Sequence, residues 1–352
     1  MGAAPGSRGA DAGRLVAIDA RAAVRPELGG VERWARELSA RLPRVRPGGY
    51  AVLAPPRRLA HRAGHAWEQA VLPVRAHRLG ASVLLCPANL APVAHPRVVV
   101  VLHDAAVLRH PGWYTRAYAA WQRCLLPAVA RRALHVVTVS EFSRRELCAL
   151  LPLEPARVTV VAGGVGEAFS PAADAAAAAA ALGLRRPYVL CVASRTARKN
   201  LAAAGPAAAA LAADGVDVVV AGGDRPQFSP ERGLTGVRLL GAVPDALLPG
   251  LYAGAEAFVL PSRYEGFGLP VLEAMASGVP VVAAESGALP ETCGGAARLC
   301  APEPEAVREA LVDLLGDAAE RERLRAAGLE RAAGFGWDRT AREIDAVLAR
   351  VA

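Results

Sequence analysis

The sequence contains almost no lysine. Of its 41 Lys and Arg residues only Lys199 is lysine, and the other 40 are arginine. Arginine therefore serves as the ordinary solvated surface cation in this chain, and most single arginines carry no functional information. The lone lysine stands out, because a compact ammonium on a flexible stem has a different chemistry from a planar guanidinium.

Long apolar segments are absent as well. The longest uninterrupted aliphatic run, Val98 to Leu102, is far too short to cross a bilayer. The first 20 residues lack the apolar core of a signal peptide, and Gly6 stands where a myristoylation signal has Ser or Thr. We therefore expect a cytoplasmic protein whose membrane contact, if any, is peripheral and at the inner face of the membrane.

The six cysteines show no C-x-x-C pairing, and most lie in apolar surroundings. This pattern predicts reduced, buried thiols rather than disulfides or a zinc site. The formal net charge of +8 suits a phosphorylated ligand, an anionic membrane surface or nucleic acid. The arginines are scattered and form no basic tail, which argues against nucleic acid.

Hydrophobic residues make up 53% of the chain and aromatic residues only 5%, so Ala, Val and Leu must build the core. Strand-like runs alternate with helix-like ones, which predicts an α/β protein with parallel sheets. Six such strands begin at Leu15, Tyr50, Ser82, Val98, His135 and Val158. Five more begin at Tyr188, Val216, Val237, Ala257 and Val279. A helix is expected from Val31.

The alternation of strands and helices is interrupted at Glu167–Pro187. This segment contains an alanine tract that favours a helix after a Ser-Pro start. We predict Rossmann-like domains at residues 14–168 and 169–336, and an amphipathic helix at 337–352 that returns to the N-terminal domain. Two such domains place the carboxyl ends of both sheets at an interdomain cleft, where ligands of α/β sheets bind.

The densest motif is "VLPSRYEGFGLPVLEAMASGVPVV", which begins at Val259. A strand is followed by a loop with Gly266 and Gly268, and then by a helix that starts near Pro270. Glycines at a helix start let backbone N–H groups approach an anion, and a carboxylate there can accept hydrogen bonds from the diol of a ribose. Glu265 and Glu273 are the candidates, although a glutamate in this place also simply favours the helix.

This segment closely resembles the retaining glycosyltransferases of family 4, which have the GT-B fold. The resemblance includes "GAVPDALLPGLYAGAEAFVLPS" before it and "ESGALPE" after it, and is strong over about half of the chain. It implies that Glu273 holds the ribose hydroxyls of a sugar nucleotide. It also implies that Glu265 and the backbone of Gly266, Phe267, Gly268 and Leu269 face the donor sugar and diphosphate.

The stretch "ASRTARKNL" follows the first strand of the second domain. The resemblance implies that Arg195 and Lys199 grip the donor diphosphate, where fixed cations stabilise the charge that grows on the leaving group. Arg198, between them, is interpreted as solvated.

Three further features lie in the N-terminal half. Gly29 and Gly30 precede a helix and form either an anion-binding turn, as the resemblance implies, or a simple turn. His103 ends a strand beside Asp104, and the resemblance implies that it positions the donor sugar. Ser140 is expected to cap a helix, with Glu141 or Arg144 near the acceptor.

Between His103 and Ser140, aromatic and apolar side chains recur at helical spacing. This stripe is either part of the core or a surface that docks on a membrane or a lipid-linked acceptor. It consists of Tyr114, Tyr118, Trp121 and Leu125.

The resemblance implies a retaining, metal-independent transfer of a hexosyl group from a nucleotide-diphosphate sugar to a glycan, lipid-linked or small-molecule acceptor. The His-Asp pair resembles the mannosyltransferase branch and favours GDP-mannose over a UDP-sugar, with no further cofactor. A non-catalytic sugar-nucleotide binder and a sugar-nucleotide epimerase stay open, whereas the absence of G-x-G-x-x-G after a strand disfavours a dehydrogenase.

Overall fold

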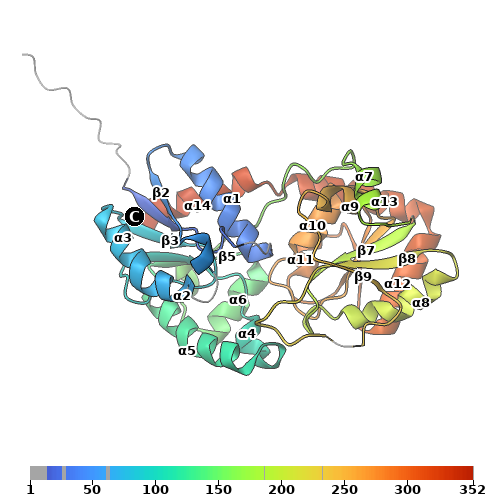
Figure 1. Cartoon of the computed structure of the whole chain (residues 1–352), viewed down its shortest axis with the longest axis horizontal. Coiled ribbons are helices and arrows are strands. Elements are labelled where there is room, and N and C mark those ends of the chain that lie inside the picture. The colour runs from blue at the N-terminus through green and yellow to red at the C-terminus, as the bar shows by residue number, and fades with distance from the viewer. Residues whose placement is uncertain (1–13, 26–28, 61–63, 186, 232, 352) are drawn as a thin grey trace, which may run out of the picture. The chain divides into compact units, whose positions relative to one another are not determined.

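A computed structural model describes residues 14–25, 29–60, 64–185, 187–231 and 233–351 (Figure 1). Gly6 and the rest of the first 13 residues lie outside this described part. The chain divides into two compact units. One holds the described residues of Met1–Val101 with Arg132–Val136 and Ala341–Ala352, and the other holds Leu102–Arg131 and Val137–Thr340. The domain boundaries expected at 168/169 and 336/337 stay a prediction.

The first sheet has six strands in the order β2-β1-β3-β4-β5-β6. Its strands are β1 (Val16–Asp19), β2 (Tyr50–Leu53), β3 (Val83–Cys86), β4 (Val98–Val101), β5 (His135–Thr138) and β6 (Val158–Val160). The pairs β1–β2, β1–β3 and β3–β4 are parallel, and β1, β3 and β4 are buried along their whole length. A strand that is covered on both faces has a continuous aliphatic sequence, so these strands could be predicted from the sequence.

The second sheet also has six strands, in the order β12-β11-β10-β7-β8-β9. They are β7 (Tyr188–Val192), β8 (Asp217–Ala221), β9 (Arg238–Gly241), β10 (Ala257–Leu260), β11 (Val281–Ala284) and β12 (Arg298–Cys300). All recorded pairs are parallel, so the prediction of an α/β protein with parallel sheets is confirmed. The short edge strand β12 was not predicted, because its sequence RLC carries too little apolar signal.

Helices connect the strands. The first half contains α1 (Gly30–Val45), α2 (Gly64–Ala66), a π-helical turn η2 (Trp67–Val71), α3 (Leu72–Arg78), α4 (Ala106–Arg109), α5 (Arg116–Arg132) and α6 (Glu141–Leu150). The second half contains α7 (Ala175–Ala181), α8 (Gly205–Ala212), α9 (Leu248–Ala253), α10 (Leu269–Ala276), α11 (Leu289–Cys293), α12 (Pro304–Gly316), α13 (Ala318–Ala333) and α14 (Trp337–Val351). The described residues also form four short 3-10 helices: η1 (Arg57–Leu59), η3 (Pro111–Trp113), η4 (Pro155–Arg157) and η5 (Leu201–Ala204).

Helix termini follow local sequence rules. The alanine tract forms α7, but the helix begins after Asp174, whose carboxylate caps it by accepting from the N–H of Ala177 at 2.8 Å. Ser140 caps α6 as expected, accepting from the N–H of Ser143 at 3.0 Å. In α14 the side chains of Ile344, Val347 and Leu348 are buried, which confirms its amphipathic pattern.

An ionic cluster is buried at the carboxyl end of β1, in the first unit. The guanidinium of Arg21 lies 2.5 Å from the carboxylate of Glu68, which belongs to the π-helical turn, and both side chains are almost fully buried. The carboxylate of Asp19 accepts a hydrogen bond from the backbone N–H of Arg21 at 2.9 Å. Burial, with a further contribution from Glu68, raises the pKa of Asp19 to about 7.

No helix in the described part of the chain is both long and apolar enough to span a bilayer.

Candidate active site

The predicted cationic segment directly follows β7. Its turn is shaped by Asn200, which has a left-handed backbone (φ 54°) and whose side-chain amide donates to the carbonyls of Pro261 and Pro302 at 2.9 and 2.7 Å. Glu231 accepts hydrogen bonds from the backbone N–H groups of Leu201 and Ala202, which begin η5. These contacts fix the backbone that directly follows Lys199.

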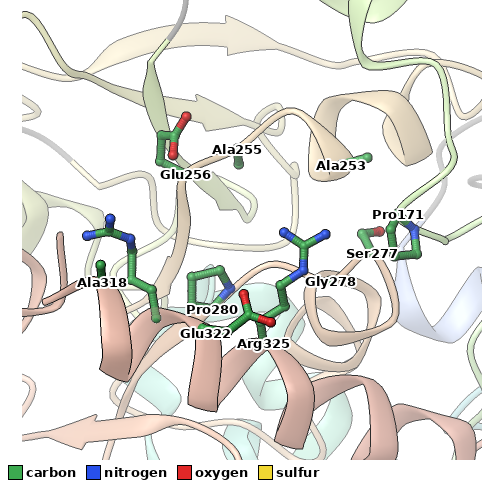
Figure 2. A pocket seen from close by; sticks show the side chains of 11 residues that line it. Pro171, Ala253, Ala255, Glu256, Ser277, Gly278, Pro280, Ala318, Glu322 and Arg325 are labelled. Atoms are coloured by element: carbon green, nitrogen blue, oxygen red, sulfur yellow. The ribbon is translucent and has the colours of Figure 1, made fainter.

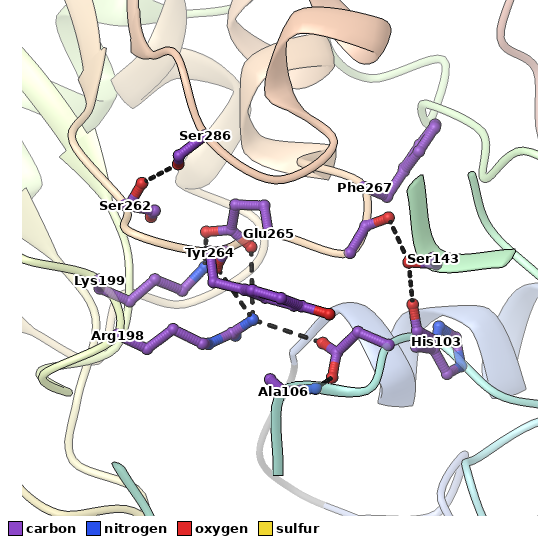
Figure 3. Close-up of polar contacts among 12 residues, drawn as sticks. His103, Ala106, Ser143, Arg198, Lys199, Ser262, Tyr264, Glu265, Phe267 and Ser286 are labelled. Atoms are coloured by element: carbon purple, nitrogen blue, oxygen red, sulfur yellow. Dashed lines mark hydrogen bonds and ion pairs between the residues drawn. The ribbon is translucent and has the colours of Figure 1, made fainter. Parts of the chain in front are cut away.

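Lys199 and Glu265 form a buried ion pair, with Nζ 2.5 Å from Oε1 (Figure 3). Glu265 follows β10, the neighbour of β7, so the two side chains meet where adjacent parallel strands end. Burial alone would raise the pKa of Glu265, but Lys199 and Arg198 outweigh it and hold that pKa below its usual range. Burial, assisted by Arg198, lowers the pKa of Lys199 against the opposing effect of Glu265.

Arg198 is not solvated, and that prediction was wrong. Its Nη1 lies 3.6 Å from Oε2 of Glu265 and 3.4 Å from Oδ2 of Asp104, and only 13% of its side chain is exposed (Figure 3). Burial alone would lower its pKa, but the two carboxylates raise it. No local sequence signal distinguishes this arginine from the other 39, because its burial depends on a loop more than 90 residues earlier.

Arg195 has a different partner from Lys199. Its guanidinium donates to Asp224 at 2.6 Å, and both side chains are substantially exposed. The structure thus brings Lys199, Arg198 and Glu265 into one cluster, whereas Arg195, on the same loop after β7, pairs with Asp224 on the neighbouring loop after β8. The diphosphate roles of Arg195 and Lys199 stay predictions.

The glycine loop of the motif packs closely on the chain at His103. The carbonyl oxygen of Gly266 accepts a hydrogen bond from the hydroxyl of Ser140 at 2.6 Å. It also accepts from the hydroxyl of Ser143 at 3.0 Å, and Ser143 donates to the carbonyl of His103 as well (Figure 3). A Cβ atom on Gly266 would lie 2.5 Å from the carbonyl oxygen of His103. Only glycine fits at position 266. The hydrogen bonds from Ser140 and Ser143 to its carbonyl were not predicted from the sequence.

Helix α10 begins right after this loop. Its N-cap is Gly268, which has φ 105°, and Pro270 lies in the first turn as expected. Leu269 is the first helical residue, and the carbonyl of Phe267 accepts from the hydroxyl of Thr292 at 2.5 Å. The loop is therefore held by hydrogen bonds from two other helices, α6 and α11.

Glu273 lies one turn into α10 and is buried. The hydroxyl of Tyr252, in α9, donates to its Oε2 at 2.9 Å. This tyrosine belongs to the segment that carries the family resemblance, but its contact with Glu273 was not anticipated. A buried carboxylate oriented by a tyrosine is a suitable acceptor for hydroxyl groups.

Gly29 and Gly30 lie at the N-terminus of α1, in the first unit. Gly29 is the N-cap, and its backbone N–H donates to the carboxylate of Glu32 at 3.0 Å. The anion-binding role of these glycines stays a prediction.

A separate hollow of about 240 Å³ is lined by polar side chains of α13, including Arg321 and Arg325 (Figure 2). Glu256 and Pro280 border it just before β10 and β11 begin. It therefore lies at the amino edge of the second sheet, opposite to the edge where Glu265 follows β10, and it includes none of the predicted site residues.

Two family models match the chain: "Glycosyltransferase Family 4" over residues 28–169 and "Glycosyl transferases group 1" over residues 186–317. The O-antigen chain mannosyltransferase B of Escherichia coli is 31% identical over 256 residues, which cover 69% of this chain and 67% of that protein.

Solved structures share the fold. Sucrose-phosphate synthase from Thermosynechococcus elongatus superposes with a TM-score of 0.75 at 19% identity, over 96% of this chain and 99% of that one. Anabaena HepE in complex with UDP-glucose gives a TM-score of 0.71 at 17% identity, over 96% and 100%. The paired-glutamate motif, the two parallel sheets and these matches agree, and the chain belongs to the family 4, group 1 glycosyl transferases: it is a hexosyltransferase with the GT-B fold.

Proposed function

We propose that this enzyme is a retaining transferase that moves a mannosyl group from GDP-mannose to a glycan, lipid-linked or small-molecule acceptor. The E. coli relative is named as a mannosyltransferase of an O-antigen chain, and the Anabaena structure holds UDP-glucose, a nucleotide-diphosphate sugar. The observation that carries the proposal is the buried cluster of Lys199 and Arg198 around Glu265 at the carboxyl edge of the second sheet.

The chemistry requires positive charge at the leaving diphosphate. Lys199 is already desolvated and held in place by Glu265, so its charge acts in a medium that screens it little. In this proposal Lys199 and Arg195 contact the diphosphate, and Arg198 keeps Glu265 ionised. These cations take the role that a divalent metal has in other transferases, so the reaction is metal-independent.

Glu273 is assigned to the ribose hydroxyls. Its carboxylate lies one turn into α10, while the N-terminus of the helix carries the partial positive charge that suits the diphosphate. His103 and the backbone of Gly266–Leu269 then border the donor sugar. Retention needs no protein base in this scheme, because the departing phosphate accepts the proton of the acceptor hydroxyl.

The test is turnover by the purified protein with a panel of GDP- and UDP-sugars, with release of the nucleoside diphosphate measured in the presence and absence of EDTA. We expect GDP-mannose to be consumed fastest, EDTA to have no effect, and the product to keep the anomeric configuration of the donor by NMR. Faster turnover of a UDP-sugar would replace the donor assignment, and an inverted product would refute retention. Turnover of no sugar nucleotide would refute the proposed function.

A further inference from the structure

An aromatic cluster includes Tyr264, on the loop that carries Glu265, and has no part in the function proposed above. His110 and Trp113 stack with ring centroids 4.0 Å apart. Tyr264 meets both rings edge-on, at 5.9 and 6.4 Å, and meets the ring of Phe142 at 5.2 Å. Aromatic residues make up only 5% of the chain, so a group of three aromatic rings and a histidine is a notable concentration.

The chain connects this aromatic cluster to the ionic cluster of Lys199, Arg198 and Glu265 in two places. Tyr264 is the immediate chain neighbour of Glu265. Asp104, which pairs with Arg198, begins the segment that continues through α4 to His110 and Trp113. Segment Trp113–Thr115 is itself fixed by backbone hydrogen bonds with Gln227 and Ser229. The segments that carry the aromatic rings are thus continuous with the segments that carry Asp104 and Glu265 of the ionic cluster.

The surface of the cluster is partly open and has a polar border. Pro111 and Gly112 are exposed, and His110 and Trp113 are partly exposed. Next to them Arg109 forms a bidentate ion pair with Glu146, with distances of 2.7 and 2.9 Å. Tyr264 itself is buried, with 4% of the residue exposed. An apolar ring face bordered by a few fixed polar groups is typical of a small-molecule site.

We propose that His110, Trp113 and Tyr264 form the subsite for the acceptor, and that the ring of Trp113 stacks on the C–H face of an acceptor pyranose. Such a face is apolar and weakly positive, which matches the negative face of an aromatic ring. The hydroxyls at the rim of the sugar reach the Arg109–Glu146 ion pair, and the buried Tyr264 holds the two rings by its edge-on contacts. This inference rests on the proposed function and adds the residues that select its acceptor.

The donor nucleobase is the other flat ring that could stack here, and the placement of the residues disfavours it. The ribose is assigned to Glu273, which lies on the α10 side of Glu265 and is oriented by Tyr252. Tyr264, which the rings contact, precedes Glu265 in the chain, whereas α10 and Glu273 follow it. The base and the cluster are therefore expected at different ends of the site.

The experiment compares two reactions of the full-length enzyme, namely hydrolysis of GDP-mannose in the absence of a sugar and transfer to methyl α-D-mannopyranoside. In Trp113→Ala we expect the KM for the mannoside to rise about tenfold, which corresponds to the loss of one stacking contact. The KM and rate of donor hydrolysis should stay within about twofold of wild type, because the donor site is untouched. Trp113→Phe keeps a ring and should recover most of the affinity.

Leu239→Ala is the matched control, because it removes an exposed apolar side chain on β9, outside the cluster and outside every predicted site. It should leave the KM for the mannoside unchanged. An unchanged mannoside KM in Trp113→Ala, or wild-type enzyme that hydrolyses the donor without any saturable response to the sugar, overturns the acceptor subsite alone. A raised KM for GDP-mannose in Trp113→Ala assigns the ring to the nucleotide and also overturns it. Absence of donor turnover in the wild type overturns the proposed function itself.

Discussion

The ammonium of Lys199 lies 2.5 Å from a carboxylate oxygen of Glu265, and more than nine-tenths of each residue is buried. Buried ion pairs contribute little net stability, since desolvation of the two charges offsets their attraction. The pair is better understood as preorganisation, because it holds a desolvated cation at the carboxyl edge of the sheet.

Replacing Lys199 tests whether this cation acts in the transition state. We expect Lys199→Ala to lower kcat by about 100- to 1000-fold, the usual cost of removing one preorganised charge. The affinity for the nucleotide should change much less, because other groups hold the ribose. Steady-state kinetics with GDP-mannose and calorimetry with GDP measure the two effects separately.

Lys199→Arg is the informative companion to that variant. It keeps the charge but replaces a compact ammonium with a larger, planar guanidinium. We expect an activity between those of wild type and Lys199→Ala. A wild-type rate in Lys199→Ala would remove the diphosphate assignment.

Arg198→Met tests the electrostatic role of the buried arginine. Arg198 helps to keep the pKa of Glu265 below its ordinary value, so its loss moves that pKa upward. A carboxylate with a depressed pKa stays ionised until the pH falls through its native pKa, so the variant should lose activity at a higher pH than wild type. The acid limb of the pH profile of kcat/KM for the donor measures this shift.

The control for this prediction is Arg263→Met, which removes an exposed arginine on the loop just before Tyr264. Its acid limb should coincide with that of wild type. An acid limb in Arg198→Met that also coincides with wild type would show that Arg198 does not control Glu265.

Gly266→Ala tests the close packing of the glycine loop. The new methyl would lie 2.5 Å from the carbonyl oxygen of His103 and 2.8 Å from Cβ of Asp104, so backbone must move. We expect the free energy of unfolding to fall by about 1–3 kcal/mol, together with a loss of activity. Gly112→Ala is the matched control, since a methyl there meets nothing within 4 Å. Equal urea midpoints for the two variants would contradict the packing.

Asp19→Asn tests the buried cluster of the first unit. The pKa of Asp19 is about 7 in the folded protein against an ordinary value of 3.8, so the native state binds more protons between these values. The free energy of unfolding of the wild type therefore falls as pH rises through this window. Asparagine does not titrate, so the stability of the variant relative to wild type should increase from about pH 5 to about pH 8, measured by urea unfolding.

The exposed Asp214→Asn provides the background pH dependence for this comparison. A difference between Asp19→Asn and wild type that stays constant with pH would show that Asp19 ionises normally in the folded state.

The sequence by itself determined the two parallel sheets, the capping of α6 by Ser140, the helix start near Pro270 and the family. These features are local: buried parallel strands are continuous aliphatic runs, and caps and glycine turns depend on a few neighbouring residues. Lys199 was recognisable in the same way, as the single lysine after a strand.

Only the tertiary structure decided which partners these residues have. The sequence did not indicate the different surroundings of two nearby arginines: Arg198 is buried between Glu265 and Asp104, whereas Arg195 pairs with Asp224 near the surface. Tyr252 and Glu273 are 21 residues apart in the chain and meet only because α9 and α10 pack together. The burial and charge environment of a side chain are set by contacts distant in sequence, and these contacts shift its pKa and give it a chemical role.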